Sequence, residues 1–328
     1  MALLLSANDV RQALPIKDAI ETSREAFREL ALGNVNMPLR IHLKTLPDDG
    51  DILVMPSHIP QTGMVGVKLV KIFKANPARG LPFIQGLVIV SDDSNGAILA
   101  IMDGAALTAL RTGAASGLAT DLLARKESRV VAVFGAGVQA RTQLDAVRSV
   151  RDIREVRIHD HVPGAADRFA RKLEAETGLS ARGVDSGREA LDGADIVCAA
   201  TTSPVPVFRD VDVGPGTHIN AIGSFRPEVQ EICEGTVVRS KTVVDLKEMA
   251  LAESGDLIIP IQRGLMTEKD IHGDLGDVLI GRLPGRENDE EITLFKSVGL
   301  AMQDLAAAAR IIENCRTMNI GTTFSFQD

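Results

Sequence analysis

Residues 130–140 constrain the fold more than any other segment of this chain. They read Val-Val-Ala-Val-Phe-Gly-Ala-Gly-Val-Gln-Ala, an apolar run followed by a Gly-x-Gly-x-x-Ala turn. The apolar run predicts a buried strand, and the residues after the turn predict a helix. Gly135 permits the tight turn, Gly137 lets a pyrophosphate approach the backbone, and Ala140 lets the helix pack closely on the strand. We therefore expect a dinucleotide-binding βα unit, with the pyrophosphate at the helix N-terminus, rather than a plain strand–turn–helix connection.

An acidic residue follows the next predicted strand. Asp160 lies 25 residues after Gly135, near the offset of roughly 20 residues at which a carboxylate binds the adenosine ribose. Such a carboxylate accepts hydrogen bonds from the ribose hydroxyls and repels the 2′-phosphate of NADP. Residues 161–164 contain no Arg, although His161 can bind phosphate when it is protonated. We expect NAD as the cofactor, with NADP possible.

Predicted strands and helices alternate through the second part of the chain, which is typical of a parallel α/β sheet. The expected strands are 129–134, 155–159, a short one near 181, 196–200, 218–222, 242–245 and 292–297. The expected helices are 138–150, 165–177, 188–191 and 300–314, and the polar stretch 284–291 is expected to be a solvated loop.

The first hundred residues have a different pattern. A helix is expected at 16–32, a half-buried strand at 39–44, further strands at 52–55, 64–73, 83–90 and 97–102, and a hairpin turn at 92–96. A long helix is expected from 103 to 126, in which Gly113 and Gly117 form a small face for close packing. The fold class is α/β, a Rossmann-type doubly wound parallel sheet with an additional α+β domain.

Composition excludes several classes of protein. Tyr and Trp are absent, which excludes reductases that use a tyrosine as proton donor. A net charge of −8 argues against nucleic acid or an anionic membrane as partner. The distant Cys198, Cys233 and Cys315 argue against a metal site and indicate reduced thiols. No apolar run approaches the ~20 residues of a spanning helix, and the N-terminal segment does not match a signal peptide. We expect a cytoplasmic protein.

Three cations lie in apolar surroundings in the first domain. Arg40 follows Pro-Leu, Lys68 follows Gly-Val and Arg111 follows Ala-Leu. An Arg side chain presents a planar fork that matches a carboxylate, and a Lys side chain is a point charge whose pKa moves on burial. If the three converge, they clamp an anionic substrate such as an amino or imino acid. Spacing alone equally allows three unrelated surface cations.

These features, with several further motifs in the same order, resemble the ornithine cyclodeaminase/mu-crystallin family over essentially the whole chain. The matching segments are 36–40, 55–56, 66–68, 100–103, 110–115, 135–140, 218–223 and 292–299. The resemblance implies that Arg40, Lys68 and Arg111 bind the substrate carboxylate, with Lys68 and Arg111 as the catalytic residues. Met55 and Phe225 are expected to contact the substrate as well.

The resemblance also implies a cofactor site and a domain arrangement. The expected cofactor-binding residues are Thr112, Gly135, Gly137, Val138, Gln139, Asp160, Thr201, Thr202, Ile222, Gly223, Ser297 and Gly299. A substrate-binding and dimerisation domain is expected at 1–118 with 311–328, and a dinucleotide-binding domain at 119–310. The family resemblance further implies a homodimer joined through the first domain.

Residue 225 separates the activities found in the family. The run Gly223-Ser224-Phe225-Arg226-Pro227 holds Phe225 where cyclodeaminases carry an aspartate. Cyclodeamination moves several protons at the amino groups and calls for a carboxylate there, whereas reduction of a preformed cyclic imine needs a carboxylate clamp, a hydride and one proton. We therefore expect an NAD(P)H-dependent oxidoreductase that reduces small cyclic imine carboxylates of the pyrroline- or piperideine-2-carboxylate type.

Other assignments stay open at this point. Within the family the alternatives are an ornithine cyclodeaminase and an alanine dehydrogenase, and outside enzymology a non-catalytic, nicotinamide-dependent binding protein like mu-crystallin. Glu228 or Glu231 could replace the missing acid, which is the main route to a cyclodeaminase. His42 and His58 are further candidates for proton transfer and His272 for lining the cleft, against the commoner role of core or surface histidines.

Overall fold

The computed structural model describes residues 1–45 and 50–326, and the chain divides into two compact units. Unit 1 comprises Met1–Arg111 and Leu300–Asp328, and unit 2 comprises Thr112–Gly299. These bounds differ from those expected from the sequence, which fell after residues 118 and 310. The whole of helix α11 (Ala301–Met318) belongs to unit 1, because it packs on α1, α2 and the strands β3, β4 and β5 of that unit.

Unit 1 is built on a mixed sheet in the order β15-β1-β6-β5-β4-β3-β2. Strands β2 to β6 form an antiparallel meander, and β1 pairs parallel with β6 and antiparallel with β15. The strands are β1 (Ala2–Leu5), β2 (Ile41–Thr45), β3 (Gly50–Ile59), β4 (Met64–Ile72), β5 (Ile84–Asp92), β6 (Ile98–Asp103) and β15 (Thr322–Phe324). The helices are α1 (Ala7–Ala13), α2 (Ile16–Ala31), α11 and the first part of α3 (Gly104–Leu123).

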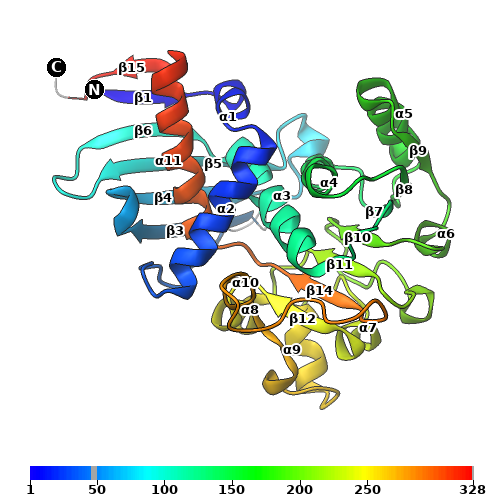
Figure 1. Cartoon of the computed structure of the whole chain (residues 1–328). Coiled ribbons are helices and arrows are strands. Elements are labelled where there is room, and N and C mark those ends of the chain that lie inside the picture. The colour runs from blue at the N-terminus through cyan, green and yellow to red at the C-terminus, as the bar shows by residue number, and fades with distance from the viewer. Residues whose placement is uncertain (46–49, 327–328) are drawn as a thin grey trace. The chain divides into compact units, whose positions relative to one another are not determined.

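Helix α11 covers one face of this sheet, and α2 packs beside it (Figure 1). Ser57 Oγ on β3 donates a hydrogen bond to the carbonyl of Ala301 at 3.1 Å. A Cβ on Gly66 would lie 2.9 Å from the side chain of Leu305, so the glycine lets the helix approach β4 closely. Ser57 and Gly66 therefore face α11. Because side chains alternate along a strand, the residues directly before and after each of them point to the opposite face of the sheet.

That opposite face is apolar and only partly covered. Cross-strand neighbours in register form one row of Ile41, Val54, Leu69 and Leu87 and a second row of Pro56, Val67, Ile89 and Ile101. Strand β2, expected to be half-buried, is instead exposed on both faces, and its Ile41 and Leu43 are 60% and 54% exposed. The difference arises because β2 is the edge strand, beyond the strands that α11 contacts.

Unit 2 holds a parallel sheet in the order β13-β12-β14-β11-β10-β7-β8-β9, the doubly wound sheet expected from the sequence. Its strands are β7 (Val130–Phe134), β8 (Glu155–His159), β9 (Ser180–Gly183), β10 (Ile196–Ala199), β11 (His218–Ala221), β12 (Lys241–Val244), β13 (Gly273–Asp274) and β14 (Thr293–Lys296). Its helices are α4 (Val138–Val150), α5 (Ala165–Thr177), α6 (Gly187–Leu191), α7 (Glu234–Arg239), α8 (Lys247–Glu253), α9 (Gly255–Gln262) and α10 (Leu275–Leu279). A buried apolar cluster lies on each side of the sheet.

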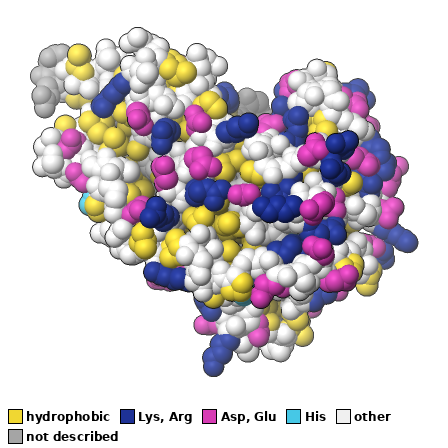
Figure 2. Space-filling view, viewed as in Figure 1, with side chains coloured by type: hydrophobic (Ala, Val, Ile, Leu, Met, Phe, Trp, Pro, Cys, Tyr) yellow, Lys and Arg dark blue, Asp and Glu magenta, His cyan; other side chains and the backbone are white. Residues whose placement is uncertain are grey.

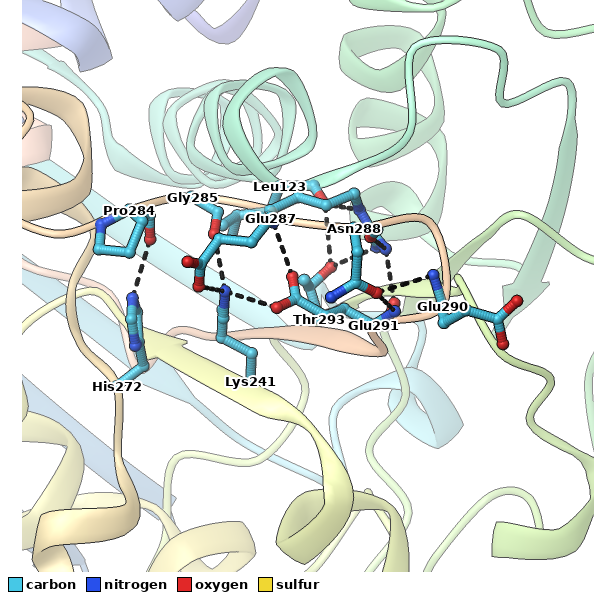
Figure 3. Close-up of polar contacts among 11 residues, drawn as sticks. Leu123, Lys241, His272, Pro284, Gly285, Glu287, Asn288, Glu290, Glu291 and Thr293 are labelled. Atoms are coloured by element: carbon cyan, nitrogen blue, oxygen red, sulfur yellow. Dashed lines mark hydrogen bonds and ion pairs between the residues drawn. The ribbon is translucent and has the colours of Figure 1, made fainter.

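The polar stretch before β14 is exposed as expected, and it is also anchored. Figure 3 shows the ammonium of Lys241 against the carbonyl of Gly285, at 2.9 Å, and against the carboxylates of Glu287 and Glu291. In the same view His272 lies against the carbonyl of Pro284, 2.8 Å from its Nε2. Hydrogen bonds at both ends of the stretch therefore fix it to the rest of unit 2.

Several short elements escaped the sequence patterns. In unit 1 these are β1, α1 and β15, and in unit 2 they are β13 and the helices α7 to α10. Each has eight residues or fewer, so it shows too little of a helical or strand period to be recognised. Helix α1 does carry a local signal, a capping box in which Ser6 and Asp9 satisfy each other's backbone N–H groups.

Basic and acidic side chains are interspersed over the face of the molecule shown in Figure 2. In the part of the chain that the structure describes, no helix combines the length and the apolar character needed to cross a membrane.

Replacing Gly113 by Ala is expected to lower the free energy of unfolding by about 1–3 kcal/mol. A Cβ at Gly113 on α3 would lie 2.5 Å from the backbone carbonyl oxygen of Thr142 on α4. That overlap with backbone outweighs the gain in helix propensity, which is about 1 kcal/mol. Denaturant unfolding of Gly113→Ala against Gly214→Ala, where a Cβ meets nothing within 4 Å, measures the effect. Equal stability of the two variants would refute the close packing of α3 on α4.

Candidate active site

The expected cofactor-binding residues of unit 2 lie at one edge of its sheet. Gly135 directly follows β7, Asp160 β8, Ile222 β11 and Ser297 β14, and Thr201 is the second residue after β10. Because all these strands are parallel, their carboxyl ends meet at the same edge. The order of strands reverses between β7 and β10, which is where ligands bind in open α/β sheets.

The glycine-rich turn has the geometry that a pyrophosphate needs. Gly135 has a φ of 96°, and a Cβ there would lie 2.8 Å from the carbonyl oxygen of Ala200. Gly137 caps α4, has an ordinary φ of −95°, and a Cβ on it would meet nothing within 4 Å. The positive φ and the close approach of Ala200 therefore require a glycine at position 135. At position 137 the absence of a side chain instead leaves open space in front of the N-terminus of α4. That space fits a bound dinucleotide phosphate.

The side chain of Asp160, just after β8, is held by hydrogen bonds from backbone N–H groups. Its Oδ2 accepts from the N–H of Ala136 at 2.7 Å, and its Oδ1 accepts from the N–H of Val162 at 2.8 Å. Each carboxylate oxygen has a further lone pair, so these bonds leave acceptor capacity for a ribose diol. His161 is 86% exposed with its Nδ1 3.6 Å from Asp160 Oδ1.

Glu231 connects two of the expected nicotinamide segments. Its Oε1 accepts from the backbone N–H and the hydroxyl of Thr201, both at 2.7 Å, and its Oε2 accepts from the N–H of Gly223 at 2.8 Å. Burial raises the pKa of the Glu231 carboxyl, Lys296 opposes this rise, and Asp256 adds to it. Both carboxylate oxygens of Glu231 accept hydrogen bonds from backbone N–H groups. This geometry is that of a residue that fixes two loops together, and not that of a catalytic acid that replaces the missing aspartate.

A second buried carboxylate organises the third segment. Asp245 Oδ2 accepts from Ser297 Oγ and from the N–H groups of Val298 and Gly299, all within 2.8 Å. Beneath these loops Lys296 and Asp256, both fully buried, form an ion pair of 2.7 Å. The loops of unit 2 that are expected to border the nicotinamide thus lie over buried charged side chains.

The other expected residues of unit 2 vary in exposure. Val138, at the start of α4, is 69% exposed, and Thr202 is also exposed. Gln139 is half-buried and Thr112 is buried on α3. Phe225 is half-buried, with the guanidinium carbon of Arg226 5.8 Å from its ring centroid.

In unit 1 the structure brings the predicted catalytic pair together around one carboxylate. Lys68 lies on β4 and Arg111 on α3, and both are buried. Lys68 Nζ is 2.6 Å from Asp304 Oδ2, and Arg111 Nε donates to Asp304 Oδ1 at 3.0 Å. Arg111 Nη1 also donates to Gln303 Oε1 at 3.2 Å.

The surroundings of Lys68 weaken its hold on a proton. Burial and the positive charges of Arg111 and Arg40 lower the pKa of Lys68, Asp304 raises it by charge and by its hydrogen bond, and together these effects leave it at about 7. The neighbouring side chains on the same face of the sheet are apolar, Met55 on β3 and Val88 on β5. A lysine of this kind exchanges a proton near neutral pH.

Arg40 and Met55 also lie at this cluster. Arg40 precedes β2 rather than lying within a strand, and it is close enough to Lys68 to lower the pKa of that side chain. Met55 is buried directly opposite Lys68 in the register of β3 and β4. The structure therefore joins Lys68 and Arg111 through Asp304 and brings Arg40 near enough to act on Lys68 by its charge, which spacing alone had left undecided.

The remaining acid–base candidates have partners of other kinds. His42 Nε2 lies 2.7 Å from Asp51, His58 Nε2 lies 3.0 Å from Asp93, and Glu228 is exposed. With the contact of His272 with Pro284, each of these three histidines has a hydrogen-bond partner within its own unit.

Sequence reasoning missed Asp304, Gln303, Asp245 and the Lys296–Asp256 pair. A signal for the first two was present, since Gln303-Asp304 is a polar interruption in Leu300-Ala-Met-Gln-Asp-Leu-Ala-Ala-Ala. Two adjacent polar residues at the start of such an apolar helix suggest buried partners. Asp245 stands directly after β12, at the edge where ligands bind, but no motif marks it.

The geometry of unit 2 defines a dinucleotide-binding domain of the Rossmann type. The model of the ornithine cyclodeaminase/mu-crystallin family matches residues 1–319, and this chain belongs to that family. A Bacillus cereus Delta(1)-pyrroline-2-carboxylate reductase is 37% identical over 99% of this chain and 100% of its own.

Two solved structures are similar over nearly their whole length. The Thermococcus litoralis Delta(1)-pyrroline-2-carboxylate reductase, in complex with NADH and L-proline, has a TM-score of 0.96 and 42% identity, covering 98% of this chain and 100% of its own. An archaeal alanine dehydrogenase, a dimer with bound NAD, has a TM-score of 0.93 and 38% identity, covering 99% of both chains. The family and the fold class expected from the sequence are therefore confirmed.

Replacing Gly137 by Ala is expected to weaken NADH binding at least about tenfold, or about 1.4 kcal/mol. The added methyl group enters the open space in front of α4, and it meets no protein atom within 4 Å. NADH titration followed by fluorescence measures the affinity, and thermal unfolding without NADH should be unchanged. Gly214→Ala is the matched control for an unobstructed glycine. Unaltered NADH affinity in Gly137→Ala would remove this turn from the cofactor site.

Proposed function

We propose that this protein is an NAD(P)H-dependent reductase of small cyclic imine carboxylates, with pyrroline-2-carboxylate as the representative substrate and proline as the product. The observation that carries the proposal is the buried pair of Lys68 and Arg111 in unit 1, with the half-buried Arg40 close enough to act on Lys68 by its charge. It combines guanidinium groups suited to a carboxylate with an amine that exchanges a proton near neutral pH. Unit 2 carries the dinucleotide half of the chemistry.

Each residue has a role that follows from its chemistry. Arg111 and Arg40 bind the substrate carboxylate, which places the adjacent C=N carbon. NADH, when bound, supplies the hydride that this carbon accepts. Lys68 donates a proton to the imine nitrogen, and its burial keeps competing water away. Lys68 then regains its proton from solvent.

The loops of unit 2 carry the cofactor in this proposal. Glu231 and Asp245 hold Thr201, Gly223 and Ser297–Gly299 at the strand ends, where they border the nicotinamide. Asp160 binds the adenosine ribose, which favours NAD over NADP. The relatives described with NADH or NAD support the same assignment.

The two same-family alternatives receive less support from the site. A cyclodeaminase needs a carboxylate beside the reacting amine, whereas residue 225 is Phe and Glu231 already holds two backbone segments. Alanine dehydrogenation uses the same clamp and hydride, and the archaeal relative shows that the fold accommodates it. A half-buried phenyl ring suits the wall of an apolar ring substrate better than it suits ammonia and pyruvate.

Oxidation of NADH in the presence of pyrroline-2-carboxylate tests the proposal. We expect rapid imine-dependent oxidation of NADH with stoichiometric proline, and negligible ammonia or proline from ornithine plus NAD. Pyruvate with ammonia serves as the comparison substrate for alanine dehydrogenation. Robust release of ammonia from ornithine would establish a cyclodeaminase, and a preference for pyruvate would establish an alanine dehydrogenase. Absence of NADH oxidation with every imine would leave a binding protein.

We also propose that the chain forms a homodimer through the apolar sheet face of unit 1. The two cross-strand rows beginning at Ile41 and at Pro56 form a contiguous apolar surface opposite α11. Monomeric proteins seldom expose a surface of this kind. A second copy of the chain presents the same surface, so it provides a self-complementary partner. The dimeric state of the archaeal relative supports this assignment.

Light scattering coupled to size exclusion is expected to give twice the chain mass of 35.0 kDa. Leu87→Glu, which puts a charge at an exposed position of the first apolar row, should shift the protein to the monomer mass. Val211→Glu is the matched control, because Val211 is 81% exposed but lies in unit 2. A monomeric unmodified protein, or a dimeric Leu87→Glu variant, would contradict the proposed interface.

A further inference from the structure

Asp304 is the residue that joins the cationic cluster, and neither motif nor spacing had marked it. It lies in the first turn of α11 and is 2% exposed. One carboxylate oxygen lies 2.6 Å from Lys68 Nζ, and the other accepts from Arg111 Nε at 3.0 Å. An acidic side chain is stabilised in the first turn of a helix by the helix dipole, so α11 provides a fixed seat for this charge.

Gln303 adds a second constraint on the same cluster. Its Oε1 accepts from the backbone N–H of Leu300 at 2.9 Å and from Arg111 Nη1 at 3.2 Å. The start of α11 therefore grips the Arg111 guanidinium through two of its nitrogens. Lys68, held by the other oxygen of Asp304, is thereby placed in a fixed relation to Arg111.

We propose that Asp304 is a positioning residue for the reductase reaction: it orients Arg111 toward the substrate carboxylate and keeps Lys68 protonated for transfer to the imine nitrogen. The inference rests on the proposed function for the identity of the reaction, but the contacts of Asp304 do not depend on it.

The charges around Lys68 explain why a carboxylate is needed beside it. Among the residues that the structure describes, the charged groups that shift the pKa of Lys68 are Asp304 and two cations, Arg111 from α3 and Arg40 from the segment before β2. The strands beside it offer only Met55 and Val88. Burial and both cations lower the pKa of Lys68, and Asp304 alone among these groups raises it, leaving it at about 7.

In the reduction that Asp304 supports, bound NADH would supply a hydride to the C=N carbon and the Lys68 ammonium would supply a proton to the nitrogen, forming one C–H and one N–H bond. NADH becomes NAD⁺, and Lys68 becomes a neutral amine that solvent reprotonates. Asp304 keeps its charge throughout and exchanges no atom with the substrate.

Titration of Lys68 by ¹³C NMR in protein labelled at lysine Cε tests this role without requiring turnover. Lys68→Arg identifies the signal. In the unmodified protein we expect Lys68 to titrate near pH 7, and in Asp304→Asn we expect its midpoint to move down by about one unit or more. Asp304→Glu, which keeps the charge, should restore most of the shift. Asp51→Asn is the matched control, since Asp51 is equally buried in unit 1 but is bonded to His42.

The pH profile of imine reduction provides the kinetic counterpart. Because Lys68 must carry the proton, kcat/KM should fall as the pH rises through about 7, and this limb should move to lower pH in Asp304→Asn. The KM for the imine should also rise, because Arg111 loses its orientation, while the affinity for NADH stays unchanged. Asp51→Asn should change neither the limb nor the KM.

Several outcomes would overturn the inference. An unchanged titration midpoint of Lys68 in Asp304→Asn would show that Asp304 does not keep the proton on Lys68. If the fall of kcat/KM with rising pH occurs at the same pH in this variant, Asp304 has only a structural role. If Asp304→Asn does not fold, the unmodified protein still decides: a Lys68 midpoint near 10, or a kinetic limb that does not coincide with it, contradicts the proposal. Absence of imine reduction with a shifted Lys68 midpoint would instead refute the proposed reaction and leave the role of Asp304 in the cluster intact.

Discussion

The ion cluster of Lys68, Asp304 and Arg111 is the interaction on which unit 1 depends. Its three members come from a strand, from the C-terminal helix and from the helix that leads into unit 2. Removing one partner of such a buried group leaves an unpaired charge and costs about 3–5 kcal/mol. Helix α11 follows unit 2 in the sequence but packs in unit 1, where it supplies Asp304. Without this helix, Lys68 on β4 and Arg111 on α3 would lack the negative charge of Asp304.

Buried carboxylates also fix the structure of unit 2. Its loops at the carboxyl ends of the strands present backbone groups that need acceptors, and Glu231 and Asp245 provide them from buried positions. The Lys296–Asp256 pair carries charge beneath the loops, and Asp256 also accepts from the N–H groups of Glu231 and Ile232. Buried carboxylates therefore fix geometry in both units, by holding cations in one and backbone in the other.

Periodic and local signals were sufficient for much of this architecture. The glycine turn and the acid after the second strand predicted the dinucleotide edge because their spacing follows directly from the βα geometry. The cations Arg40, Lys68 and Arg111 were visible as charges among apolar residues. Asp304 was harder, because it meets Lys68 across more than two hundred residues and its helix shows no special spacing. The edge position of β2 was not predictable either, since alternation gives the faces of a strand but not its neighbours.

Transfer of deuterium from dideuterated [4,4-²H₂]NADH to the product tests whether the cofactor hydride reaches the imine carbon. We expect pyrroline-2-carboxylate in ordinary water to yield proline with one deuterium at the α-carbon, because the hydride passes directly to the carbon beside the bound carboxylate. The proton on nitrogen should come from the protein and solvent and carry no label. Proline whose α-carbon carries only protium, or NADH oxidation without any proline, would rule out direct hydride transfer to the imine carbon.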